Sequence, residues 1–311
     1  MAGCKETGTS QQVITDRACP ICGGQDYILL EEICDQLVSG QLFPLLRCRH
    51  CGLIITGNAP KKEELGHYYR NKAYVSHSNT NQGLINKLYH YIRHFTLKRK
   101  YHLIKRLTNG RKGISLLDVG AGTGHFAALM KKKGYAVSCV EQDSEARLFM
   151  EHNFSLSSSP YLNDISIPVA SQDVITLWHV LEHIPDLENH FSLFRKLITA
   201  EGFLILALPN PSGYDAAHYG KDWAAYDVPR HLWHFSPELI CRLAEKEGFT
   251  LVEKHIMPFD AYYIALLSEQ HRNNKGIRSY VKAFTIGLKT NLKARRQSSY
   301  ASALTYVFRL T

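Results

Sequence analysis

The chain has 311 residues, of which 45% are hydrophobic, so it can bury the core of one large domain with an appendage, or of two domains. No apolar run approaches the roughly 20 residues that a bilayer-spanning helix needs, and the first residues lack the apolar core of a secretory signal. We therefore expect a cytoplasmic protein. The net charge of +9 lies at the end of the chain, because residues 271–311 hold nine Lys and Arg and no acidic residue, which leaves 28 basic and 28 acidic residues before them. This balance makes a nucleic-acid partner unlikely for the body of the protein.

Two cysteine pairs with the same spacing mark the N-terminal region. Each pair is a Cys-x-x-Cys followed by glycine, which lets two thiolates reach one ion while the backbone folds beneath them. Four thiolates complete a closed, tetrahedral Zn2+ site with a structural role. We predict a zinc ribbon over residues 1–60, in which metal binding is coupled to folding, with His50 on its surface. An iron–sulfur cluster and a redox pair are the alternatives. The four predicted ligands are Cys19, Cys22, Cys48 and Cys51.

The next segment, residues 61–112, is aromatic and basic. Its apolar residues between positions 84 and 107 recur at helical spacing, which predicts one or two helices that pack on a sheet. The run Lys-Arg-Lys at 98–100 is most simply a solvated face. Tyr74 and His77 either pack in the ordinary way or close over a ligand as a lid.

The stretch from position 114 to 124 contains the strongest functional motif. An apolar run typical of a buried strand leads into three glycines at alternate positions, and an amphipathic helical stretch follows. Strand, glycine turn and helix bind nucleotide-like cofactors in open α/β sheets, because glycine lets the backbone pass close to the ligand. A second apolar strand, 135–140, ends at Glu141, whose carboxylate suits the paired hydroxyls of a ribose. A glycine-rich turn without a ligand is the alternative.

We place the limits of this domain at residues 113 and 260, that is 113–260. The rest of it contains several more predicted strands. Apolar runs predict them at 174–178, 202–210 and 249–256. Another strand is expected near 156–164, where Asn163 or Asp164 would meet an adenine amine.

His179 follows the predicted strand 174–178 directly. Ligands in open α/β sheets bind outside the carboxyl ends of the strands, so His179 is a candidate site residue. Glu182 and His183 come next, and they either contact a ligand or support the start of the following helix.

A segment without periodicity, residues 209–229, precedes a helix that begins near Ser236. A loop this long is usually functional or disordered, and its aromatic and titratable residues favour function. His231 is our first candidate for a general base and His179 the second, because a neutral imidazole suits an O- or N-acceptor. Arg230 would hold an anionic group of the substrate. Each histidine alone is as readily explained as a loop anchor. The predicted substrate contacts are Trp223, Tyr226 and His234.

The C-terminal segment, residues 261–311, is predicted to be helical. From position 277, apolar residues share one helical face and basic residues lie among them. A basic amphipathic helix can lie on an anionic membrane surface. It can equally pack in an oligomer or cover the sheet.

Three motifs carry a resemblance to a known family. Residues 118–124, Asp-Val-Gly-Ala-Gly-Thr-Gly, resemble the first motif of the class I S-adenosylmethionine-dependent methyltransferases. Residues 181–186, Leu-Glu-His-Ile-Pro-Asp, resemble the fourth motif region of small-molecule methyltransferases, including quinone-biosynthesis O-methyltransferases. Together with the cysteine pairs, residues 229–232 and 234–237 resemble bacterial methyltransferases with an N-terminal zinc ribbon that serve polysaccharide or other secondary pathways.

The resemblance implies a Rossmann-like, doubly wound α/β sheet of seven strands and the transfer of a methyl group from S-adenosylmethionine to a small molecule. A sugar, a quinone or a related metabolite would accept it at oxygen, or at carbon or nitrogen. An RNA-binding or RNA-modifying protein and a membrane-docked scaffold without turnover are the rival functions. By this resemblance the cofactor-binding residues are Asp118, Gly120, Ala121, Gly122, Gly124, Glu141, Asp164 and His179.

Overall fold

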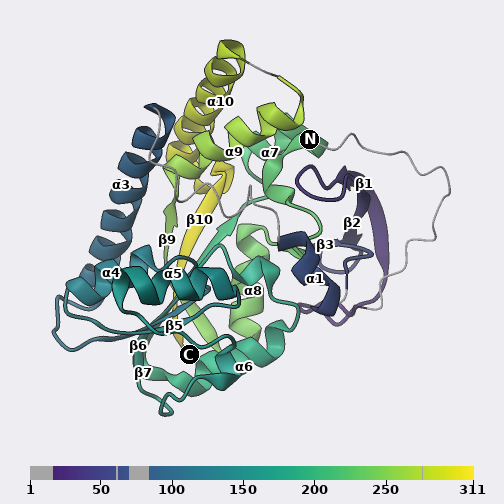
Figure 1. The fold of residues 1–311 in the computed structure, drawn as a ribbon. Coiled ribbons are helices and arrows are strands. Elements are labelled where there is room, and N and C mark those ends of the chain that lie inside the picture. Colours follow the sequence, from purple (N-terminus) through teal and green to yellow (C-terminus); the bar gives the residue numbers. More distant parts are fainter. Residues whose placement is uncertain (1–16, 61, 70–83, 275) are drawn as a thin grey trace.

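A mixed sheet of six strands forms the centre of the computed structural model, which describes residues 17–60, 62–69, 84–274 and 276–311 (Figure 1). The first four strands in spatial order are parallel to one another, and β10 is antiparallel to both of its neighbours. The spatial order is β5 (Ala136–Val140), β4 (Ser115–Val119), β6 (Gln172–Trp178), β7 (Ile198–Pro209), β10 (Ala303–Leu310) and β9 (Phe249–Ile256).

Helices cover both faces of this sheet, as a doubly wound fold requires. Successive strand residues point to opposite faces, so Leu116 joins the core cluster with Phe126 and Met130, whereas Leu117 joins the cluster with Phe191. The Rossmann-like prediction is therefore confirmed. One face is covered by α3 (Leu84–Leu107) and α4 (His125–Lys132), the other by α6 (Leu187–Leu197) and α8 (Pro237–Lys246), and α5 (Ser144–Phe154) packs beside α4.

The sheet has one strand fewer than the seven we predicted. The strand expected near 156–164 is reduced to a single bridge between Val140 and Ser159, followed by a 3-10 turn, Leu162–Asp164. Consecutive serines and Pro160 occupy this stretch, and neither residue type supports a continuous ladder.

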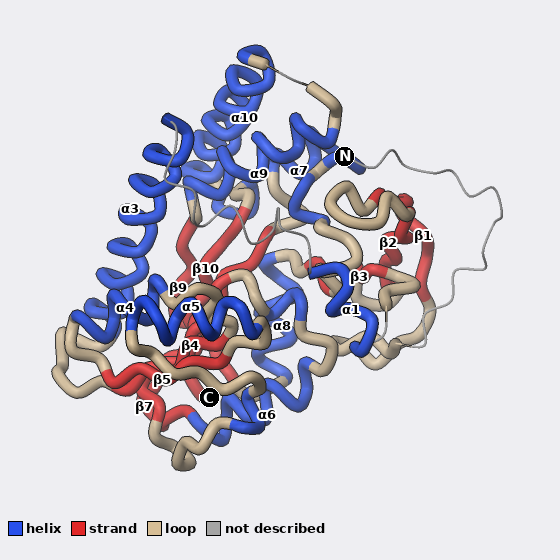
Figure 2. Tube along the Cα trace, in the orientation of Figure 1, coloured by secondary structure: helices blue, strands red, loops and turns tan. Residues whose placement is uncertain are grey.

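The C-terminal segment was predicted to be helical throughout, whereas the structure ends it with a strand. Two helices, α9 (Pro258–His271) and α10 (Ile277–Arg296), form a hairpin, and a 3-10 turn, Ser298–Tyr300, follows. The chain then re-enters the sheet as β10, paired with β7 on one side and β9 on the other (Figure 2). Aromatic and β-branched residues at 305–308 favour this strand, a signal that the helical periodicity upstream obscured.

The ribbon is joined to the large domain through a shared sheet. Strands β1 (Tyr27–Cys34), β2 (Leu42–Cys48) and β3 (Ile54–Thr56) are antiparallel and precede α1 (Lys62–Tyr69) (Figure 1). The fourth strand of this sheet is β8 (Trp233–His234), which lies among the predicted site residues between the segment 209–229 and the helix that begins near Ser236. The predicted boundary at residue 60 therefore does not separate two independent sheets.

The segment predicted as a loop without periodicity contains short helical elements. These are α7 (Tyr214–Tyr219) and the 3-10 turns Gly220–Asp222 and Ala224–Tyr226. Tyr219 and Trp223 pack with Ile264 and Ile286 from the α9–α10 hairpin, so this segment is a packed block of the domain.

Candidate active site

The glycine turn after β4 has the geometry that cofactor binding needs. Gly120, Gly122 and Gly124 have φ values of 72°, 54° and 77°, which L side chains rarely adopt. A Cβ on Gly120 would lie 2.4 Å from Val180, whereas one on Gly122 would meet no atom within 4 Å. The backbone at Gly122 therefore borders open space.

Glu141 lies beside this turn. The Gly122 amide donates to one carboxylate oxygen of Glu141 at 2.7 Å, and the Asp143 amide donates to the other at 2.9 Å. Burial raises the pKa of Glu141 above its ordinary value. The glycine turn and Glu141, the two parts of the predicted cofactor site, are thus adjacent. Asn163 and Asp164 are both exposed, and their contact with adenine stays a prediction.

Asp118 and Lys100 are two ionisable residues whose charges influence each other's pKa. The Thr176 hydroxyl donates to buried Asp118 at 2.7 Å, and burial raises the pKa of Asp118 to about 7. Burial lowers the pKa of Lys100 to about 8, although the charges of Asp118 and Asp260 oppose the shift. The Lys100 ammonium lies 4.1 Å from the centroid of the Trp178 ring.

The prediction that Lys100 belongs to a solvated face was therefore wrong. Lys100 lies four residues before the buried Ile104 and three after Leu97, which also packs against that core. The i+3 and i+4 spacing that identifies a buried helix face would have assigned Lys100 to it.

His179 is an anchored cation at the tip of β6. Its backbone is left-handed, with φ at 58°, which is unusual for a residue other than glycine. Its Nε2 lies 2.8 Å from Asp260 and its Nδ1 3.5 Å from Glu182. Burial alone would lower the pKa of His179, but the two carboxylates outweigh it and raise this pKa to about 9. A ring that is protonated at neutral pH is a poor general base, which argues against our second candidate.

Arg230 is not available to an anionic substrate, contrary to the prediction. Its guanidinium is 1% exposed and bonds Asp35 at 3.0 Å and Asp227 at 2.7 Å, with a further bond to the Tyr68 carbonyl. Arg230 thus ties the ribbon, α1 and the substrate loop together. Removing one partner of such a buried ion pair typically costs about 3–5 kcal/mol.

Two of the predicted substrate contacts are also structural. Trp223 is 1% exposed and donates its indole N–H to Asp215 at 2.9 Å. Buried His234 lies with its Nε2 3.0 Å from the hydroxyl of Thr56, and that hydroxyl donates to the His231 carbonyl at 2.6 Å. Both side chains are bonded within the protein in this conformation, and their contact with substrate stays a prediction. Tyr226 is partly exposed, and its role stays a prediction.

Glu182, His183 and His231 converge on one point, although only His231 was predicted to be catalytic. Their possible ligating atoms all lie within 4.8 Å of one another. The His231 ring packs edge-on against the His183 ring, with centroids 4.6 Å apart. The Tyr69 hydroxyl lies 3.0 Å from Nδ1 of His183. The sequence motif contained Glu182 and His183, and its local spacing could not show that His231 joins them.

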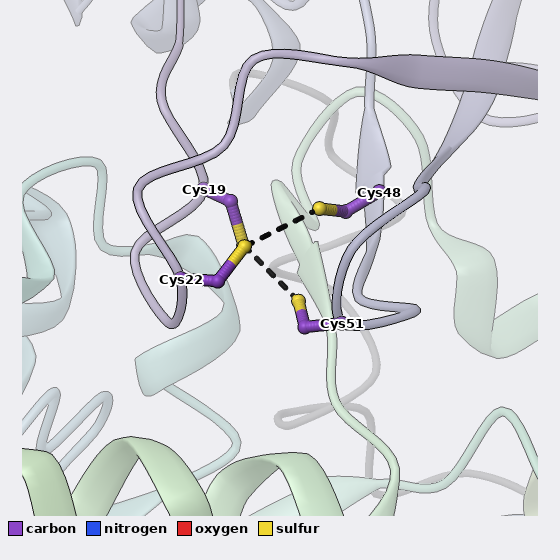
Figure 3. Close-up of side chains that lie close together, drawn as sticks. All are labelled: Cys19, Cys22, Cys48 and Cys51. Carbon is purple, nitrogen blue, oxygen red and sulfur yellow. Dashed lines mark hydrogen bonds between the residues drawn. The ribbon is translucent and has the colours of Figure 1, made fainter.

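The four predicted metal ligands also converge (Figure 3). The Cys19 and Cys51 sulfurs are 3.3 Å apart, those of Cys22 and Cys48 are 3.5 Å apart, and all four lie within 4.8 Å of one another. Tetrahedral coordination with Zn–S bonds of about 2.3 Å needs sulfur separations of about 3.8 Å. The donor set and its spacing therefore fit Zn2+. His50 is exposed beside the site.

Comparison with known proteins identifies the family. A family model described as "Methyltransferase domain" matches residues 90–254, more than half of the chain, so the protein belongs to this methyltransferase family. The ubiquinone biosynthesis O-methyltransferase of Aeromonas salmonicida (strain A449) is 26% identical over 186 residues, which are 55% of this chain and 75% of that protein. The enzyme of the same name from Idiomarina loihiensis is 24% identical over 196 residues, covering 53% and 79%.

Solved structures share the fold. Geranyl diphosphate C-methyltransferase from Streptomyces coelicolor A3(2) has a TM-score of 0.54 at 13% identity, covering 82% of this chain and all of that chain. Phosphoethanolamine N-methyltransferase 2 from Haemonchus contortus has a TM-score of 0.52 at 15% identity, covering 83% and 61%. The family identifies the protein as an S-adenosylmethionine-dependent methyltransferase, and the solved structures share its fold.

Proposed function

We propose that the protein methylates an oxygen atom of its small-molecule acceptor. The curated relatives are named O-methyltransferases, which supports oxygen over carbon or nitrogen. In this reaction the acceptor oxygen forms a bond to the methyl carbon while the bond from that carbon to the sulfonium sulfur breaks. The acceptor must also lose a proton, so a proton-accepting group is needed near the tip of β6.

The cofactor is proposed to lie against the glycine turn. The observation that carries this placement is the contact between the Gly122 amide and the Glu141 carboxylate, at the edge of open space. Glu141 would bind the ribose hydroxyls. Asp118 and Lys100 are charged groups below the turn, suited to the amino and carboxylate groups of the methionine end.

We propose His231 as the proton acceptor. Its Nδ1 donates to the Ala225 carbonyl at 2.8 Å, because a carbonyl can only accept. In the neutral ring the lone pair is therefore on Nε2, which lies 4.0 Å from Glu182. This orientation leaves Nε2 able to take a proton, with a carboxylate near enough to stabilise the resulting cation.

Replacement of Glu141 tests the proposed cofactor placement. We expect wild-type protein to bind S-adenosylmethionine in calorimetry, and Glu141→Ala to weaken binding about 10–100-fold through the loss of charge-assisted hydrogen bonds. Glu145→Ala, an exposed acid on α5, is the matched control and should bind normally. Unchanged affinity in Glu141→Ala would remove Glu141 from the site, and absence of binding by wild type would refute the function itself.

We infer that the four ribbon cysteines hold a structural Zn2+ ion. The inference is supported by the sulfur separations and by the absence of an open coordination position in a four-thiolate set. The cysteines would hold the two ends of the ribbon together, and no chemistry on the acceptor is assigned to them.

We also propose that α10 contacts an anionic membrane surface. Five apolar side chains on this helix are between 41% and 77% exposed, and basic residues flank them. Such a face can insert its apolar residues among lipid acyl chains while lysine and arginine meet the headgroups. In the described ranges, no helix has the length and apolar character to cross a bilayer. The five residues are Ile277, Val281, Phe284, Leu288 and Leu292.

Vesicle binding tests this contact. Wild-type protein should sediment with phosphatidylglycerol vesicles, less so at high salt, and Val281→Ser with Phe284→Ser should weaken binding more than about 10-fold through the lost apolar burial. Leu148→Ser, at a 66% exposed position on α5, is the control. A wild-type dimer that the double variant converts to monomers would assign the face to a second copy instead.

A further inference from the structure

The carboxylate of Glu182 is deeply buried without a hydrogen-bond donor. The side chain is 1% exposed, and within the described part of the chain no donor forms a hydrogen bond with either oxygen. The nearest ring nitrogens are those of His179 at 3.5 Å and His231 at 4.0 Å. The His179 cation is shared between Glu182 and Asp260, which it meets at 2.8 Å, so it offsets the burial of the Glu182 charge through one long contact. Both Glu182 oxygens still lack a hydrogen-bond donor, and this requires an explanation.

The imidazole rings of His183 and His231, which neighbour Glu182, do not supply the missing hydrogen-bond donor. Nδ1 of His231 donates to the Ala225 carbonyl at 2.8 Å, and Nδ1 of His183 lies 3.0 Å from both the Arg230 carbonyl and the Tyr69 hydroxyl, which can itself accept. Carbonyl oxygens only accept hydrogen bonds, so each Nδ1 carries the proton and each neutral ring has its lone pair on Nε2. The Nε2 lone pair of His231 and a Glu182 oxygen then face each other as acceptors 4.0 Å apart, and His183 offers a ring nitrogen within 4.8 Å of both residues.

We propose that Glu182, His183 and His231 bind a first-row divalent cation. A cation satisfies all of these lone pairs at once. Donors bound to one such ion at about 2.0–2.2 Å lie up to about 4.3 Å apart, and the three residues offer atoms within 4.8 Å of one another. Side-chain shifts of a few tenths of an ångström would complete the site.

The surroundings have the form of a metal site. Histidine ligands of metals usually donate their second ring N–H to a carbonyl or carboxylate, which orients the ring, and His183 and His231 both have such a carbonyl. Two imidazoles and one carboxylate suit Mn2+, Fe2+ or Zn2+ and leave coordination positions open. The site is distinct from the ribbon, whose four thiolates favour Zn2+.

The catalytic consequence rests on the proposed function, whereas the existence of the site does not. With a cation bound, Nε2 of His231 would serve as a ligand, and the cation would lower the pKa of an acceptor hydroxyl beside it, so that the proton would pass to solvent instead of to the ring. Without a cation, His231 remains the proton acceptor proposed above.

Manganese binding tests the proposal. The protein to be measured is the full chain with zinc already bound to the ribbon cysteines. Mn2+ competes poorly for thiolates, so it reports on the second site alone. We expect calorimetry to show one Mn2+ bound per chain in the absence of S-adenosylmethionine, and Glu182→Gln to weaken it more than about 10-fold. The matched control is Glu253→Gln, which alters a surface pair 2.7 Å from His255 and should leave Mn2+ affinity unchanged.

Spectroscopy on the wild-type protein keeps the test valid even if Glu182→Gln fails to fold. Electron spin echo modulation from imidazole nitrogen around bound Mn2+ would support the site. Absence of bound Mn2+, absence of that modulation, or equal affinity in folded Glu182→Gln would overturn the proposal. Since S-adenosylmethionine binding is measured separately, failure of the metal site and failure of the methyltransferase function give different results.

Discussion

Chelation of zinc should disorganise the segment that contains His231 while S-adenosylmethionine binding persists. The reason is the shared sheet, in which Ile54 and Ile55 of β3 pair with β8. The Thr56 amide also donates to the Leu232 carbonyl at 3.0 Å. Structural zinc contributes on the order of 10 kcal/mol to the folding of small zinc domains, so its loss should unfold the ribbon and release β8.

Hydrogen exchange followed by mass spectrometry measures this effect without a known acceptor. After chelation, or in Cys48→Ser, protection of residues 231–234 should fall at least about 100-fold, whereas β4 keeps its protection because it lies in the large sheet. Calorimetry should show an S-adenosylmethionine affinity within about 3-fold of wild type, a change below 1 kcal/mol. Cys241→Ser, a cysteine on α8 outside the ribbon, is the control. Undiminished protection of β8 after zinc loss would show that the ribbon does not position the loop.

Local signals in the sequence were enough to predict the glycine turn and the position of Glu141 after the next strand. The three glycines need left-handed backbone whatever surrounds them, and Glu141 follows the next strand directly, so both could be recognised from a short stretch of chain. The same holds for α8, where the Ser236 hydroxyl accepts from the Leu239 amide as an N-cap. The class of enzyme was predicted from the resemblance of residues 118–124 to a family motif.

The acceptor side depends on contacts between distant parts of the chain. Arg230 resembled a substrate-binding residue because its partner Asp35 is 195 positions away in the sequence. His234 resembled a substrate contact because the Thr56 hydroxyl beside it is equally remote. A titratable residue in a loop looks functional in sequence whether it faces a ligand or a buried partner, since only the fold determines which.

Strand β10 is expected to contribute more to stability than the exposed face of α10. Phe308 is fully buried, and β10 pairs with strands on both sides. Phe308→Ala should therefore lower the free energy of unfolding by about 3–5 kcal/mol in urea denaturation. Phe284→Ala makes the same chemical change at a side chain that is 60% exposed, and it should cost less than about 1 kcal/mol.

Because β10 is needed for stability, the membrane contact of α10 has to be tested without removing β10. Deleting residues 271–311 would remove β10 together with α10 and leave β7 and β9 without their shared neighbour. Loss of vesicle binding in that truncated chain would report unfolding rather than the loss of a lipid-binding face. Substitutions at Val281 and Phe284 avoid this, provided that their unfolding free energy stays close to that of wild type. Equal destabilisation by Phe308→Ala and Phe284→Ala would contradict the central place of β10 in the sheet.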